Sequence, residues 1–117
     1  NTAGVEAFLD GVSARATIPS NTLWAFDLLC IGRSDAGICA AWTVKGAIRN
    51  NAGTTALAAA VTVALLADES GGTWGAVGNA PVASADNAND SLKIAVTGAL
   101  VTNIRWAIHG RIIEVAY

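Results

Sequence analysis

The sequence contains a single histidine, His109, so any Ser-His or Cys-His pair for nucleophilic catalysis would have to use it. It lies in "TNIRWAIHGRIIEVAY", which alternates like a strand and places His109 on one face with Arg105, Ala107 and Arg111. Two neighbouring cations disfavour the imidazolium form and make His109 a poor general base. We therefore expect His109 to lie in solvent or in a subunit interface, and we expect no catalytic residues.

The two cysteines, Cys30 and Cys39, do not complete a metal site with this histidine. A zinc site needs three or four convergent ligands, whereas strand parity places the two thiols on opposite faces of a sheet. The sequence therefore predicts no zinc site.

The carboxylate pairs are Asp68 with Glu69, and Asp86 with Asp90 in "ADNANDS". The second pair lacks the spacing of a calcium loop and its distal glutamate, so an Asx-rich turn is the better interpretation. Four glycines follow closely on one another: Gly71, Gly72, Gly75 and Gly78. A phosphate-binding loop needs a Lys-Ser/Thr pair and a helix after its glycines, and neither follows here, which excludes such a loop. We expect neither a metal nor a cofactor.

Four tryptophans are many for a chain of 117 residues. Trp24, Trp42 and Trp106 fall on predicted core faces, whereas Trp74 follows a glycine-containing loop. An exposed Trp74 could stack on a sugar ring as part of a glycan platform. The alternative is that Trp74 caps an open end of the core, which its large apolar area favours.

The composition is apolar and weakly charged, with 53% hydrophobic residues, 14% charged residues and a net charge of −2. Nucleic-acid surfaces need clustered Lys and Arg, which this chain lacks. The longest apolar candidate, residues 56–67, is interrupted by Thr62 and falls short of a membrane span. We therefore expect neither nucleic acid as a partner nor membrane insertion, and we assign the apolar excess to a subunit interface.

The chain opens "NTAGVEAF", contains no methionine and shows no signal-peptide pattern. We expect it to be a fragment, a processed product or an incompletely determined sequence. Its length points to a single domain, residues 1–117.

Short segments with strand patterns alternate with turn signals, which predicts an all-β fold. We expect an antiparallel β-sandwich, jelly-roll-like, of about seven or eight strands. Residues 54–69 combine helix-favouring alanines with strand-like alternation, and we assign them to a strand because their neighbours are strands and no N-cap box precedes them. The predicted strands are 5–9, 14–18, 22–33, 38–49, 54–69, an irregular pair at 73–77 and 82–85, 91–98 and 103–116.

Side-chain parity in the hairpin of 22–33 and 38–49 decides the pairing of the cysteines. The core face of this hairpin collects Trp24, Phe26, Leu28, Cys30, Ile38, Ala40, Trp42, Val44 and Ile48. The opposite face collects Asp27, Arg33, Cys39, Thr43, Lys45 and Arg49. Because Cys30 and Cys39 fall on opposite faces, we expect no disulfide between them and a buried Cys30.

The two remaining apolar strands are assigned in the same way. Leu92, Ile94 and Val96 point inward in the strand 91–98, as do Ile104, Trp106 and Ile108 in the last strand. Ile112 and Ile113 break the alternation of the last strand, which predicts either a bulge there or burial of both faces.

Five segments occur in a fixed order: "AFLDGVSARATIPSNTLWAFDLL", "NNAGTTALAAAV", "TWGAV", "ADNANDSLKIAVTGA" and "TNIRWAIHGRIIEV". Together they resemble a C-terminal domain of tail fibre and tail spike proteins of tailed bacteriophages and prophages, over about residues 5–115. The chain departs from the usual pattern in a short hairpin at Ser34–Ile38 and in "RWAIHGR", which replaces a valine-rich strand.

The resemblance implies a virion structural domain at the distal end of a fibre, where it forms a homotrimer and contacts the host surface. A host glycan or receptor would then be a second partner. It implies no catalytic residues. Two alternatives remain open: a monomeric carbohydrate-binding module, and a subunit that decorates a capsid or forms a filament. An enzyme fits least.

Alanines on faces opposite the predicted core also favour self-association. Solvent-facing strands usually carry Thr, Lys, Glu or Arg at such positions, whereas small apolar residues let another surface approach closely. The positions are Ala25, Ala41, Ala47, Ala95 and Ala107. The alternative is that alanine is neutral filler on a surface of low charge.

Overall fold

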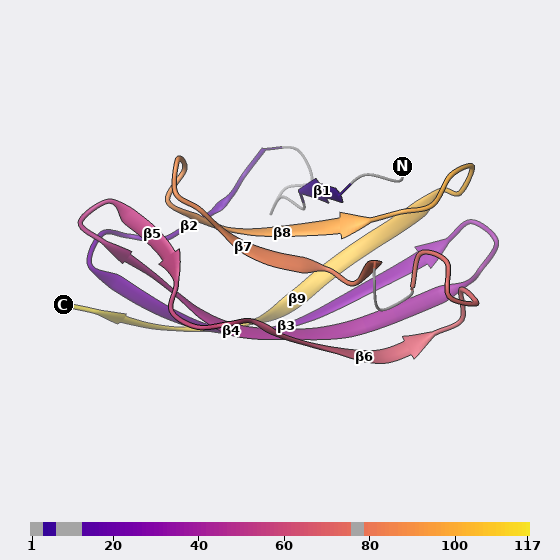
Figure 1. Cartoon of the computed structure of the whole chain (residues 1–117), viewed down its shortest axis with the longest axis horizontal. Helices are drawn as coiled ribbons and strands as arrows, with labels where there is room; N and C mark the ends of the chain where they lie inside the picture. The colour runs from indigo at the N-terminus through magenta and orange to yellow at the C-terminus, as the bar shows by residue number, and fades with distance from the viewer. Residues whose placement is uncertain (1–3, 7–12, 76–78) are drawn as a thin grey trace.

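The computed structural model describes residues 4–6, 13–75 and 79–117, which form two antiparallel β-sheets packed face to face (Figure 1). The predicted antiparallel β-sandwich is therefore confirmed. The strands are β1 (Gly4–Glu6), β2 (Ala16–Thr17), β3 (Thr22–Ser34), β4 (Cys39–Asn51), β5 (Thr54–Leu57), β6 (Thr62–Asp68), β7 (Val82–Asp86), β8 (Ser91–Thr97) and β9 (Ile104–Ala116).

The larger sheet has the order β5-β4-β3-β9, and β6 pairs with the part of β4 that β5 leaves free. The smaller sheet is built on β8, with β7 along one side and the short strands β1 and β2 along the other. The larger sheet is therefore four strands wide, and β9 forms one of its edges (Figure 1).

The β3–β4 hairpin has the predicted parity, because even-numbered residues oppose even-numbered residues throughout, as in Trp24 opposite Ile48 and Cys30 opposite Trp42. The tight connection closes through Gly37, whose positive φ of 84° suits glycine. Ile38 belongs to this connection and is exposed, so its predicted place on the core face is wrong.

The segment 54–69 is extended, as predicted, but forms two strands instead of one. β5 and β6 pair in turn with the same edge of β4, and the register shifts at Ala41/Trp42. The irregular strand predicted at 73–77 is also wrong for residues 73–75, which form a turn held by side-chain hydrogen bonds. The rest of that segment, and residues 7–9 of the predicted first strand, lie outside the described residues.

β9 runs alongside β3 with an unbroken register from Ile104 to Ala116. Neither alternative predicted for Ile112 and Ile113 is correct: the register contains no bulge there, and the two side chains are 42% and 67% exposed. Among the described residues, only β3 pairs with this half of β9, which is consistent with the loss of alternation in its sequence.

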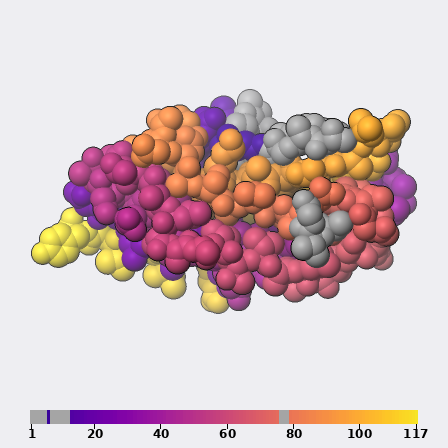
Figure 2. All heavy atoms as spheres, in the orientation of Figure 1, coloured from indigo at the N-terminus to yellow at the C-terminus, as the bar shows by residue number. Residues whose placement is uncertain are grey.

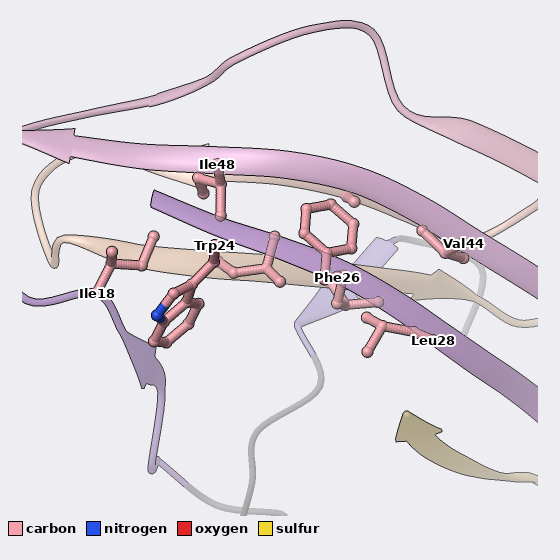
Figure 3. Packing of buried hydrophobic residues seen from close by; sticks show 9 residues of the cluster. Ile18, Trp24, Phe26, Leu28, Val44 and Ile48 are labelled. Carbon is pink, nitrogen blue, oxygen red and sulfur yellow. The ribbon is translucent and has the colours of Figure 1, made fainter. Parts of the chain in front are cut away.

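The main core lies between the two sheets, where residues of β3 and β4 meet those of β8 (Figure 3). Its buried members include Ile18, Trp24, Phe26, Leu28, Val44, Ile48, Leu92 and Ile94. The buried Asn50 side chain donates a 2.9 Å hydrogen bond to the Ile18 carbonyl, which ties the end of β4 to the segment before β3. Within the described ranges, no helix is long and apolar enough to cross a membrane.

Candidate interaction surface

His109 lies on the exposed face of the larger sheet, as predicted, and is opposite Leu29 on β3. Arg105 and Arg111 share this face with it. The next residue in the cross-strand row is Thr43 on β4, and Asp27 and Arg111 line the same shallow hollow as His109. Across residues 4–6, 13–75 and 79–117, no three His, Cys, Asp or Glu side chains converge to hold a metal ion.

The Asp68 carboxylate orders the loop that follows β6 through hydrogen bonds. Asp68 Oδ1 accepts hydrogen bonds from the Ser70 backbone N–H at 2.7 Å and from the Ser70 hydroxyl at 2.5 Å. The Ser70 oxygen accepts in turn from the Gly75 N–H at 2.9 Å. These hydrogen bonds to Ser70 hold the pKa of Asp68 below its usual value.

Asp86 and Asp90 belong to an Asx-rich turn, which confirms that part of the sequence interpretation. Asp86 accepts hydrogen bonds from the Asn89 side chain at 2.6 Å and from its backbone N–H at 3.2 Å, which lower the pKa of Asp86. Asp90 accepts from the Thr55 hydroxyl at 2.8 Å, so the β7–β8 turn is fastened to β5. Both carboxylates are thus engaged within the fold.

Trp74 is only 3% exposed and therefore caps the core instead of offering a ring to solvent. It meets Trp106 edge-on at a centroid distance of 5.7 Å, and Trp106 stacks on Trp42, also at 5.7 Å. Trp42, Trp74 and Ala40 form a second buried cluster, and the partly buried Trp106 packs against it. The feature that suggested a glycan platform is thus absent from Trp74.

The cysteines lie as parity predicts, and both are free thiols. Cys30 is fully buried, and this burial raises the pKa of its thiol to about 12. Cys39 lies on the opposite face of the same sheet, beside Arg33.

The face of the larger sheet that points away from the smaller sheet is called the outer face below. Its cross-strand rows, read from β9 through β3 to β4, are Val115–Leu23–Arg49, Ile113–Ala25–Ala47, Arg111–Asp27–Lys45, His109–Leu29–Thr43, Ala107–Ile31–Ala41 and Arg105–Arg33–Cys39. Beyond β4, Ala64 and Ala67 of β6 continue the fourth and fifth rows.

The outer face exposes large apolar side chains from the centre of the sheet. Leu23, Leu29 and Ile31 of β3 are between 43% and 46% exposed, and Ile113 and Val115 of β9 are more exposed still. A solvated face of an antiparallel sheet normally alternates with polar residues. A contiguous exposed apolar area of this kind marks an interaction site.

Charge on the outer face is mainly positive, although the whole chain carries −2. Five of the seven lysines and arginines lie on it: Arg33, Lys45, Arg49, Arg105 and Arg111. Among the described residues, Asp27 is the carboxylate between them. It accepts from Arg111 at 3.4 Å and lies 4.0 Å from the Lys45 ammonium.

A shallow depression of about 450 Å³ lies at one end of the outer face. Its floor is apolar and includes Ile31, Ala41, Ala67 and Ala107, and Arg33 and Arg105 border it. These two arginines face each other directly across β3 and β9. Like charges placed opposite one another are unfavourable unless an anion joins them.

No family model, no curated protein and no solved structure matches the chain. The resemblance to tail-fibre domains therefore rests on the ordered segments of the sequence.

Sequence reasoning located much of this surface but not its centre. It placed Ala25, Ala41, Ala47 and Ala107 opposite the core, and all four lie on the outer face. Ala95 also alternates with core residues, Ile94 and Val96, but it belongs to the smaller sheet and so not to the outer face. The exposed leucines and isoleucine of β3 were missed, although "TLWAFDLLCIG" is apolar on both faces, which is the pattern of a strand covered on both sides.

Proposed function

We propose that this chain is a structural domain of a virion tail fibre, which assembles with copies of itself through the outer face. The observation that carries the self-association is the exposed apolar area of Leu23, Leu29 and Ile31, surrounded by small alanines. Obligate interfaces are rich in apolar surface, and the central apolar part of this face shares that property, with the cations arranged around it. The fibre, the virion and the trimer come from the resemblance of the ordered segments.

The charge pattern favours a cyclic assembly over a face-to-face dimer. An isologous contact brings the same patch of two copies together, so cations would oppose cations. The Arg105–Arg33 row and Arg49 would then lie near their own copies without matching carboxylates. A heterologous contact, which closes into a ring, joins two different strand edges, so the direct contact does not have to pair a cation with its own copy.

Light scattering coupled to size-exclusion chromatography tests the self-association. We expect a trimer at micromolar concentration. Ala41→Arg and Ala107→Arg, which place a long cation on the outer face, should shift it to monomer. Ala88→Arg, in the exposed β7–β8 turn, should leave the mass unchanged. A wild-type chain that is monomeric would overturn the proposal.

The alternatives have distinct outcomes. A filament or capsid-decorating subunit would give open polymers or capsid-bound copies in electron micrographs. A monomeric glycan-binding module no longer has an exposed Trp74 ring to support it, because Trp74 is buried, and its other motive is the Asn-rich loops. Host-surface contact rests on the resemblance alone, and binding of the labelled domain to a panel of bacterial strains tests it; binding to none would remove that role.

A further inference from the structure

β9 presents a free backbone edge, and hydrogen bonds at both of its ends reveal which residues form it. The Asp35 N–H donates to the Asn103 carbonyl, and the Tyr117 N–H donates to the Asn21 carbonyl, both in line with the β3–β9 register. Hydrogen-bonded pairs alternate along an antiparallel ladder, so the odd-numbered residues of β9 bond to β3. The even-numbered residues direct their N–H and C=O groups outward: Ile104, Trp106, Ile108, Gly110, Ile112, Glu114 and Ala116.

This edge lacks several of the usual protections against pairing, although Arg105, Arg111 and Glu114 place charges along it. β9 contains neither proline nor lysine, its register has no bulge, and among the described residues it pairs with β3 alone. Its C-terminal end projects from the molecule (Figure 2). Unprotected edges of this length are templates for strand addition by another chain.

β6 forms the opposite edge of the same sheet. The register of its hydrogen bonds to β4 shows which of its backbone N–H and C=O groups point outward. The Cys39 carbonyl accepts from the Glu69 N–H, so odd-numbered residues of β4 bond to β6. Ala67, Ala64 and Thr62, which pair with Ala41, Thr43 and Lys45, therefore bond inward to β4. Val63, Leu65 and Asp68 direct their backbone groups outward.

The geometry points to pairing of β9 with β6 of a second copy, so that three sheets close into a ring. This inference rests on the self-association proposed above and names the strands that carry it. Because β9 runs parallel to β4 and β6 antiparallel to it, the new pair is antiparallel. Rotation about an axis along the strands preserves the rows, which places Gly110 opposite Val63, Ile108 opposite Leu65 and Trp106 opposite Asp68 of the next copy.

This register matches the two edges in hydrogen bonding, apolar contact and charge. Every pair just named joins two residues whose backbone groups point outward. The exposed Leu65 would cover Ile108, and Ala107 would meet Ala67. Arg105 would meet Glu69 of the next copy, whose Oε2 also accepts from the Cys39 N–H of its own chain at 3.0 Å, and this carboxylate would offset the charge that Arg105 places beside Arg33.

The width of the sheet selects three copies. Four strands spaced about 4.8 Å apart span about 19 Å, and each side of a triangle of that size lies about 5.5 Å from its centre. That is close to half of the roughly 10 Å between packed sheets, so the outer faces would pack on the axis. A four-fold ring would hold opposite faces about 19 Å apart and leave them unpacked.

A matched pair of prolines tests the edge. Val63→Pro removes an N–H that points away from β4, and proline is tolerated in edge strands at such positions. We expect the monomer to keep its melting temperature and the trimer to dissociate at a concentration about tenfold higher or more, as the loss of one hydrogen bond at each contact implies. Ala64→Pro removes an N–H that bonds to β4 and should lower the melting temperature of the monomer instead.

A charge exchange tests the register. Arg105→Glu and Glu69→Arg should each weaken the trimer, and the double variant should restore it. If Ala41→Arg dissociates the trimer but Val63→Pro and both charge reversals leave it intact, the edge pairing is overturned and the outer-face proposal stands. If Val63→Pro acts but the double variant does not recover, the register is wrong. A monomeric wild type would overturn both proposals.

Discussion

The indole N–H of Trp24 donates a 2.7 Å hydrogen bond to Glu114 Oε2, joining a core residue of β3 to the exposed end of β9. The two residues are directly opposite in the β3–β9 register, on the side of the sheet that faces the core. Trp24 is 8% exposed, so its indole nitrogen has little access to water. This contact fixes an end of β9 that, within the described part of the chain, is paired only with β3.

Removal of this acceptor should destabilise the fold. Glu114→Ala leaves the Trp24 N–H without its partner, and a buried donor left unsatisfied costs about 1–3 kcal/mol. Glu114→Gln retains an acceptor and should cost less. Urea unfolding at a fixed protein concentration measures both, because association adds concentration-dependent stability. Equal losses for the two variants would show that the hydrogen bond is not the cause.

Trp42 should contribute to the free energy of unfolding mainly through its packing. It is fully buried and stacks on Trp106, so Trp42→Ala should cost about 3–5 kcal/mol. Its indole nitrogen has no hydrogen-bond partner among the described residues, so Trp42→Phe loses no such bond there and should cost clearly less. A loss below about 1 kcal/mol for Trp42→Ala, the range of surface substitutions, would contradict this role.

Periodicity in the sequence was sufficient to predict the long strands and their core-facing residues, because one face of each strand is buried. Trp24, Phe26 and Leu28 alternate with less apolar or charged residues, and Leu92, Ile94 and Val96 do the same, so parity determines which side faces the core. The same argument separated Cys30 from Cys39 correctly. A fixed side-chain period of two carries this information without any tertiary knowledge.

The sequence-based predictions are wrong where the pairing between strands, and not local periodicity, determines the structure. The division of 54–69 into β5 and β6 depends on how each part meets β4, and the alternation around Leu57 and Leu65 does not encode it. Ile112 and Ile113 were misassigned because the prediction placed a partner or a bulge beside them, whereas this part of β9 pairs with β3 without a bulge and leaves both side chains exposed. The candidate surface was found only through its alanines, since exposed leucines resemble core residues in sequence.

The two thiols should differ strongly in reactivity. Burial raises the pKa of Cys30 to about 12, so it remains protonated and inaccessible at pH 8, whereas Cys39 is partly exposed. We expect a thiol reagent to modify Cys39 in the folded monomeric variant Ala107→Arg and to reach Cys30 only on unfolding. Reducing agent should not change the melting temperature, since both thiols are free. A large decrease would indicate a disulfide.

Acid stability should depend on Asp68. Hydrogen bonds from the Ser70 hydroxyl and backbone N–H, together with the Gly72 backbone, lower the pKa of Asp68 from 3.8 in the folded state. A carboxyl whose folded pKa is depressed stabilises the fold fully above its unfolded pKa, and this contribution is lost as pH falls through the folded pKa. Asp68→Asn should therefore reduce the free energy of unfolding near neutral pH and flatten its decline below pH 3.8. Ser70→Ala, which keeps the carboxylate but removes the hydroxyl donor, should flatten the decline in part. Urea unfolding between neutral pH and the acid limb measures both, and profiles parallel to that of the wild type would show that this loop does not set the acid dependence.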